Sequence, residues 1–140
     1  MMKSIVSIGY EKKSIPDLIR LLRQHRVAKL IDVRELPLSR RKGFSKTTLS
    51  VALNEAGIEY RHLRAAGNPH RAEKQNIEKC LRLYSNYLKK NPSILVSVTA
   101  EMSVTSVAFL CYEKEHDCCH RSVLIAELNR QGRRYRVVQA

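Results

Sequence analysis

The sequence predicts a single α/β domain over residues 1–140, a three-layer sandwich with a mostly parallel sheet of about five strands. Short apolar segments rich in β-branched residues alternate with longer segments whose apolar residues recur at helical spacing. Such alternation is typical of βαβ units, in which helices cover a parallel sheet on both faces. A chain of 140 residues is long enough for a core of its own, and we find no repeat or low-complexity linker.

The first third of the chain predicts a strand, a helix and a second strand. Residues 4–8 form an apolar run that Gly9 ends, and residues 29–33 form another. Between them, Ser14 is a suitable N-cap, while Asp17 in the first turn complements the helix dipole. We expect a right-handed crossover between the two strands.

The middle of the chain predicts a loop over residues 35–44, a helix capped by Ser45, and a third strand over residues 58–63. Gly57 suits the left-handed position that commonly ends a helix. The longest helical pattern covers residues 73–90 and follows a loop.

The last third predicts strands at residues 107–112 and 135–138, joined by a helix that ends at Gly132. Residues 94–102 are ambiguous because their β-branched content also suits a strand. We expect a short helix there, since a parallel sheet needs a crossover before the strand at residue 107.

The chain is strongly basic, with 26 Lys and Arg against 13 Asp and Glu, a net charge of +13 and a pI near 10.0. Such an excess favours nucleic acid or other phosphate-bearing partners. A solubilising basic surface is the alternative.

The four cysteines, of which Cys118 and Cys119 are adjacent, do not form the pattern of a secreted disulfide framework. The N-terminal apolar run is too short for a signal peptide, and no 18-residue apolar stretch occurs. We therefore expect a reduced, cytoplasmic protein without a membrane partner.

Side chains suited to catalysis or binding follow the predicted strands. The carboxyl ends of parallel strands share one edge, and open α/β sheets bind ligands there. From the strands and the loop at residues 35–44 we predict catalytic roles for Asp32, Glu113, Cys119 and His120, and binding roles for Tyr10, Arg34, Ser39, Arg40, Tyr60, His62 and Arg121.

Short motifs follow one another along nearly the whole chain: Ile8-Gly9-Tyr10, Ile31-Asp32-Val33-Arg34, Pro37-x-Ser39-Arg40, Gly57-Ile58-x-Tyr60-x-His62-Leu63, and Leu110-Cys111-x-Glu113 with Cys119-His120-Arg121 five residues later. In this order they resemble the family called domain of unknown function 488. The resemblance implies a small α/β domain with a polar cluster, and it brings no settled reaction. Two departures are Ala65-Ala66-Gly67-Asn68, in place of a more typical Leu-Gly-Gly stretch, and the additional thiol of Cys118.

The arginines of this set predict an anion site. Arg121 at a helix start would add its charge to free backbone donors, and Arg34 and Arg40 would add bidentate contacts to phosphate. The alternative is that Arg34 and Arg121 pair with Asp32 and Glu113 to support the strand ends.

Cys119 is the candidate nucleophile, because a helix start beside a histidine and an arginine favours its thiolate. A buried structural thiol is equally compatible with the sequence for Cys119, and we prefer that role for Cys111. Asp32, Glu113 and His120 are the candidates for acid–base catalysis.

Tyr10 and Tyr60 are candidates for stacking on a base, with core packing as the alternative for Tyr60. The run that begins at Ser39 and Arg40 suits contact with a phosphate backbone, as does any solvated basic loop. Five possible metal ligands lie close together in the sequence: Cys111, His116, Cys118, Cys119 and His120. Their spacing is irregular, so we assign no metal ligand, and the sequence leaves the cofactor unknown.

We predict an enzyme that acts on a phosphate-bearing substrate, a nucleotide or a nucleic acid, with the Asp/Arg/Glu and Cys-His-Arg side chains forming its site at the carboxyl edge of the sheet. Two alternatives stay open. One is a non-catalytic nucleic-acid-binding module, and the other is a metal or redox protein that uses the Cys/His cluster.

Overall fold

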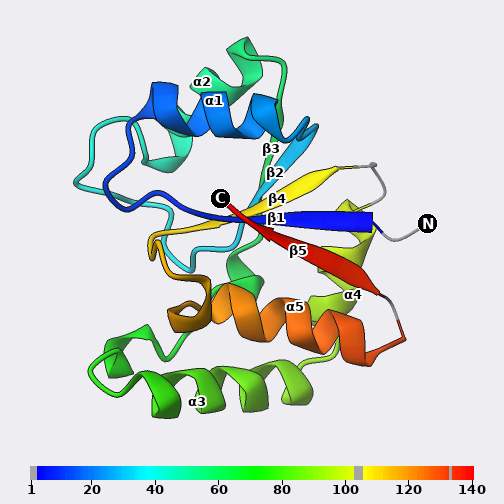
Figure 1. Cartoon of the computed structure of the whole chain (residues 1–140). Helices are drawn as coiled ribbons and strands as arrows, with labels where there is room; N and C mark the ends of the chain where they lie inside the picture. The colour runs from blue at the N-terminus through cyan, green and yellow to red at the C-terminus, as the bar shows by residue number, and fades with distance from the viewer. Residues whose placement is uncertain (1–2, 103–105, 133) are drawn as a thin grey trace.

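The computed structural model describes residues 3–102, 106–132 and 134–140, and it confirms the α/β class. Its five strands form one parallel sheet in the order β3-β2-β4-β1-β5 (Figure 1). The strands are β1 (Lys3–Gly9), β2 (Lys29–Asp32), β3 (Glu59–His62), β4 (Val107–Cys111) and β5 (Tyr135–Gln139).

Helices cover both faces of the sheet, as the three-layer prediction requires. The helices α1 (Ile15–Gln24) and α2 (Lys46–Glu55) pack on one face (Figure 1). On the other face lie α3 (Ile77–Lys90), α4 (Ser93–Glu101) and α5 (His120–Arg130). Each face has its own cluster of buried apolar side chains, and the alternating residues of the central strands supply both clusters.

The helix boundaries follow local chemistry. Ser14 caps α1 and Gly57 adopts φ +78° after α2, both as predicted. Asp17 also accepts the Ser14 backbone N–H, which completes a capping box that the sequence analysis did not predict. Ser45 precedes α2 without a side-chain cap, because its hydroxyl contacts the backbone of Ser39 instead.

The sequence left one helix ambiguous and placed the start of another too early. The segment at residues 94–102 is helical, as α4. The long helix begins at Ile77 rather than at residue 73, because the side chain of Asn76 accepts the Lys79 backbone N–H and caps it there. Arg71–Glu73 forms a separate 3-10 turn.

The topology creates a crevice at the carboxyl ends of the central strands. β4 lies between β1 and β2, and its connection leaves toward the face opposite the one covered by α1 and α2 (Figure 1). Ligands bind at such switch points. The segment after β4 crosses the end of β1 so closely that a Cβ on Gly9 would lie 1.8 Å from the carbonyl oxygen of Glu113. Only glycine fits at that position.

Candidate active site

The candidate residues from different strands do meet at this edge, in two connected groups. One group surrounds Asp32 at the end of β2, and the other surrounds His120 at the start of α5. Asp32 and Cys119, which are 87 positions apart in the sequence, therefore lie on the same side of the molecule rather than on opposite sides.

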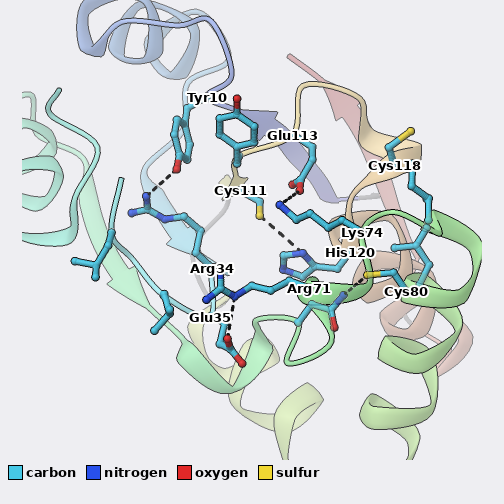
Figure 2. Close-up of a pocket in the computed structure, with 16 residues that line it drawn as sticks. Tyr10, Arg34, Glu35, Arg71, Lys74, Cys80, Cys111, Glu113, Cys118 and His120 are labelled. Carbon is cyan, nitrogen blue, oxygen red and sulfur yellow. Dashed lines mark hydrogen bonds and ion pairs between the residues drawn. The ribbon is translucent and has the colours of Figure 1, made fainter. Parts of the chain in front are cut away.

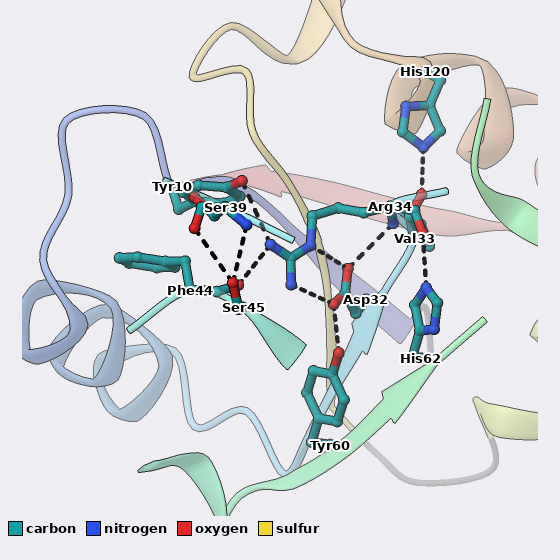
Figure 3. A network of polar contacts seen from close by, with 10 residues as sticks. All are labelled: Tyr10, Asp32, Val33, Arg34, Ser39, Phe44, Ser45, Tyr60, His62 and His120. Atoms are coloured by element: carbon teal, nitrogen blue, oxygen red, sulfur yellow. Dashed lines mark hydrogen bonds and ion pairs between the residues drawn. The ribbon is translucent and has the colours of Figure 1, made fainter. Parts of the chain in front are cut away.

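Asp32 is fully buried and accepts hydrogen bonds on both carboxylate oxygens (Figure 3). Arg34 makes a bidentate ion pair with it, from Nε to Oδ1 at 2.8 Å and from Nη2 to Oδ2 at 2.7 Å. The Arg34 backbone N–H donates to Oδ1 at 3.2 Å, and the hydroxyl of Tyr60 donates to Oδ2 at 2.5 Å. The alternative interpretation of Arg34, a buried ion pair that supports the strand end, matches this geometry.

The remaining Arg34 donor is also used inside the protein. Nη1 donates to the carbonyl oxygen of Phe44 at 2.7 Å and to the Tyr10 hydroxyl at 3.4 Å. Burial disfavours the charged guanidinium, but the hydrogen bonds and charge of Asp32 outweigh it and raise the pKa of Arg34. Burial and the charge of Asp32 both raise the pKa of Tyr60, so Tyr60 is a phenol at neutral pH. Tyr10 is itself stacked on Phe44 at 4.6 Å between ring centroids.

Two backbone carbonyls after β2 connect this network to the histidines. His120 Nε2 donates to the carbonyl oxygen of Val33 at 2.7 Å, and His62 Nε2 donates to that of Arg34 at 2.8 Å (Figure 3). The end of β2 therefore fixes the orientation of both imidazole rings.

Cys111, Cys119 and His120 form a second group, here called the thiol cluster. The sulfurs of Cys111 and Cys119 lie 3.8 Å and 3.7 Å from His120 Nδ1. All three side chains are buried, although Cys111 and His120 also line a pocket. Cys111 is the last residue of β4, Cys119 is the N-cap of α5, and His120 is the first residue of that helix.

The protonation state of each member of the thiol cluster depends on its neighbours. Burial opposes a thiolate at Cys119, yet its contact with Cys111 and the charge of His120 lower its pKa well below the ordinary value. The hydrogen bond with Cys119 and burial both raise the pKa of Cys111, so Cys111 stays a thiol. Burial opposes an imidazolium at His120, but the neighbouring Cys119 raises its pKa.

Arg121 is fully buried behind this cluster. Its Nε donates to the sulfur of Cys119 at 3.1 Å, and its Nη2 donates to the carbonyl oxygen of Glu113. The predicted pairing of Arg121 with the Glu113 carboxylate does not occur. That carboxylate instead contacts Lys74, whose Nζ lies 2.8 Å from Oε1.

A pocket of about 230 Å³ opens over the thiol cluster (Figure 2). Its floor contains Cys111 and His120, and Arg71, Lys74 and Glu113 stand around it. Four of the six exposed large apolar side chains of the described residues lie at its opening, which we call the mouth: Leu36, Leu38, Ile77 and Tyr112. The pocket thus joins a polar floor to an apolar mouth.

A family model described as domain of unknown function DUF488 matches residues 14–128. The chain belongs to the DUF488 family. No curated protein and no solved structure matches it. In the part of this DUF488 chain that the structure describes, no helix has the length and apolar character needed to cross a membrane.

The pocket contains only some of the predicted site residues. Tyr10, Arg34, Glu113 and His120 line it. The others contribute from behind it or lie apart from it: Asp32, Tyr60, His62, Cys119, Arg121, Ser39 and Arg40.

Ser39 and Arg40 belong to the loop before α2. The Ser39 hydroxyl accepts the backbone N–H of Arg41 at 3.0 Å and so shapes the loop, while Arg40 is exposed to solvent. Of the other possible metal ligands, His116 forms a hydrogen bond of 2.6 Å between its Nδ1 and the Ser7 Oγ, and Cys118 is exposed.

Three residues of this DUF488 site were missed or assigned differently from the sequence. Cys111 lines the pocket, although its place in an apolar strand favoured a structural thiol. Its position as the last residue of β4 was the available signal, because strand ends reach the ligand edge. Arg71 and Lys74 carried no local signal, since only the tertiary fold brings the segment before α3 to this edge.

Proposed function

We propose that this DUF488 protein is an enzyme that binds a small phosphate-bearing compound, a nucleotide or the end of a nucleic acid strand, in the pocket. The observation that carries the proposal is a pocket at the sheet's switch point that combines reactive side chains, cations and an apolar mouth. Its volume of about 230 Å³ suits a small ligand or the terminal part of a larger one.

The cations that face the pocket are the best candidates for binding phosphate. Arg34 uses its donors within the protein, and Arg121 is fully buried and does not line the pocket. We therefore assign phosphate binding to Arg71 and Lys74. Both are about half exposed and form single ion pairs, with Glu35 and Glu113. Exposed pairs of this type are weak enough for a phosphate to replace them.

The mouth favours a ligand that also has an apolar, flat part. Leu38 is 71% exposed, and Ile77 and Tyr112 are nearly half exposed. A nucleobase would cover this apolar surface while its phosphate contacts the cations.

The reacting end of the ligand would lie over the floor. There Cys111 and His120 face the pocket, and Cys119 supports them from behind. Glu113 is the candidate general base, because its Oε2 is buried and has no hydrogen-bond partner among the described residues. Asp32 stays a positioning residue in this proposal, since its carboxylate is held by Arg34 and Tyr60.

Calorimetric titration tests the binding part of the proposal with nucleoside monophosphates, the free nucleosides and inorganic phosphate. We expect a nucleotide to bind more tightly than its nucleoside or inorganic phosphate. The variant R71Q/K74Q should weaken binding about tenfold, as expected for two partly exposed contacts worth about 1.4 kcal/mol together.

The matched control is K89Q/K90Q, which removes the same charge from the last turn of α3, the helix that follows Arg71 and Lys74. That turn lies about 20 Å along α3 from the pocket end, at 1.5 Å per residue, and we expect unchanged affinity. Equal weakening by both variants, or no binding of any nucleotide, contradicts the proposal.

Mass spectrometry of the bound nucleotide tests the catalytic part. If the Glu113 carboxylate transfers the proton, the rate of nucleotide conversion should fall by about 10²–10⁴-fold in Glu113→Gln, while nucleotide binding persists. Binding without any conversion by the wild-type protein would leave a binding module in place of an enzyme.

One observation favours a nucleic-acid-binding module as the second candidate. The exposed run Arg40, Arg41 and Lys42 belongs to the same loop as Leu36 and Leu38 of the mouth. Backbone contacts by this run would give affinity for single strands that falls steeply with salt. The variant R40Q/K42Q should then lower the salt slope while leaving mononucleotide binding in the pocket unchanged.

A further inference from the structure

We propose that Cys111, Cys119 and His120 form a Zn²⁺ site with three protein ligands and a fourth position open to the pocket. The proposal goes beyond nucleotide binding and depends only on the three side chains. Their candidate ligand atoms, two sulfurs and one imidazole nitrogen, all lie within 4.8 Å of one another. Among the described residues this is the one group of three or more His, Cys, Asp or Glu side chains found close enough to share an ion.

The distances match tetrahedral zinc. Zn–S bonds of about 2.3 Å and Zn–N bonds of about 2.05 Å place a sulfur and a nitrogen about 3.6 Å apart at the tetrahedral angle. The observed separations from His120 Nδ1 are 3.8 Å to Cys111 and 3.7 Å to Cys119. The distances from the imidazole to each sulfur therefore need to change by only a few tenths of an ångström when an ion binds, and the two sulfurs lie within 4.8 Å of each other.

The surroundings of the ligands are those of a metal site. Metal-bound histidines usually donate their second ring N–H to a carbonyl or carboxylate, which directs the other nitrogen at the ion. His120 does so through Nε2 to the carbonyl oxygen of Val33, and both sulfurs face its Nδ1. The N–H of Arg121 Nε donates to the sulfur of Cys119, a bond that supports a thiolate ligand.

The irregular spacing that argued against a metal in the sequence is explained by the fold. Cys111 comes from the end of β4, and Cys119 and His120 come from the start of α5. The neighbouring His116 and Cys118 are not part of the group, because His116 bonds Ser7 and Cys118 is exposed. The site thus consists of a strand end and a helix start rather than of a local C-x-x-C motif.

The open fourth position is what separates this site from a structural one. Structural zinc sites have four protein ligands, whereas catalytic sites keep one position for water or substrate. Cys111 and His120 line the pocket, with Glu113 and Lys74 beside them. Zinc there would act as a Lewis acid on a ligand oxygen, a role that rests on the proposed function.

Titration of the reduced, metal-free protein with Co²⁺ and then Zn²⁺ tests the site. We expect one equivalent of Co²⁺ to give thiolate charge-transfer absorption and intense visible bands of a tetrahedral ion, and Zn²⁺ to abolish both. Cys111→Ser should weaken the affinity by more than the 10–100-fold typical of losing an outer-shell partner. The matched control is Cys118→Ser, an exposed thiol next to the cluster, which should bind both ions as the wild type does.

Several results would overturn the proposal. The first is that the protein is folded, as judged by circular dichroism, but binds no stoichiometric Co²⁺. The second is an equal loss of affinity in Cys111→Ser and Cys118→Ser. The third is a cobalt spectrum without thiolate bands. Protein left in air without reductant tests the redox alternative: a loss of two hydrogens that peptide mapping assigns to Cys111 and Cys119, in a protein that binds no metal when reduced, would show a disulfide formed by oxygen instead. Because these readouts use the metal alone, they test the zinc site separately from the proposed function. The protein can lack the zinc site and still bind nucleotides, or bind zinc and no nucleotide.

Discussion

Replacing Asp32 by Asn separates a supporting role of this carboxylate from a catalytic one. Asp32 is fully buried, and Arg34 is 4% exposed, so solvent does not screen their interaction. The carboxylate accepts three N–H groups of Arg34 and the hydroxyl of Tyr60. Asparagine keeps the shape but removes the charge, and its amide NH₂ would face donors.

Asp32→Asn should lower the free energy of unfolding, because it leaves the buried guanidinium of Arg34 without its counter-charge. Removing one partner of a buried ion pair costs about 3–5 kcal/mol. An unfolding entropy of about 2.1 cal/mol/K per residue amounts to about 0.3 kcal/mol/K for this chain of 140 residues. The melting temperature should therefore fall by about 10–17 °C.

Urea unfolding and calorimetry measure this loss. The double variant D32L/R34M is the control, because it removes both charges and leaves no buried charge unpaired. We expect it to unfold at a higher temperature than Asp32→Asn, although the carbonyl of Phe44 loses its donor. If the free energy of unfolding of Asp32→Asn decreases by less than about 1 kcal/mol, the supporting role is refuted and Asp32 returns to the catalytic candidates.

Two further predictions concern the packing of the site. Gly9→Ala should destabilise the protein and displace the segment after β4, since the new Cβ would overlap the Glu113 carbonyl; unchanged Co²⁺ and nucleotide binding together with unchanged stability would contradict this. Burial and the nearby Arg121 lower the pKa of His116 below the ordinary value of histidine, about 6.5. The unfolded state therefore binds a proton more readily, and stability falls as the pH drops below about 6.5. His116→Asn, which can still bond Ser7, should lose less unfolding free energy than the wild type between about pH 7.5 and 5.5; equal losses would show that His116 does not titrate with folding.

The fold could be predicted because each element has a local cause. The capping box at Ser14, the left-handed Gly57 and the apolar run of β4 are readable from neighbouring residues. The start of α3 was placed too early because the apolar periodicity does not show which polar residue caps the helix. Asn76 decides it through a single side-chain bond.

The candidate site was predictable only in part. The rule that parallel strands end at one edge was enough to bring Asp32 and His120 together. It did not show how donors and acceptors pair, because pairing depends on side-chain directions within a few ångströms. Of the two ion pairs that the sequence offered as an alternative, Arg34 with Asp32 forms, whereas Arg121 donates to a backbone carbonyl rather than to the Glu113 carboxylate.

The supporting network and the reactive floor share the same few backbone atoms. Arg34 and Asp32 hold the chain just after β2, and the carbonyl of Val33 in that segment accepts the N–H of His120. A carbonyl held in this way sets the tautomer and the ring direction of the imidazole, which determines where Nδ1 points. Nδ1 is the atom that meets both sulfurs of the thiol cluster. The buried ion pair thus acts on the thiol cluster through one hydrogen bond, while Arg34 also lines the pocket directly.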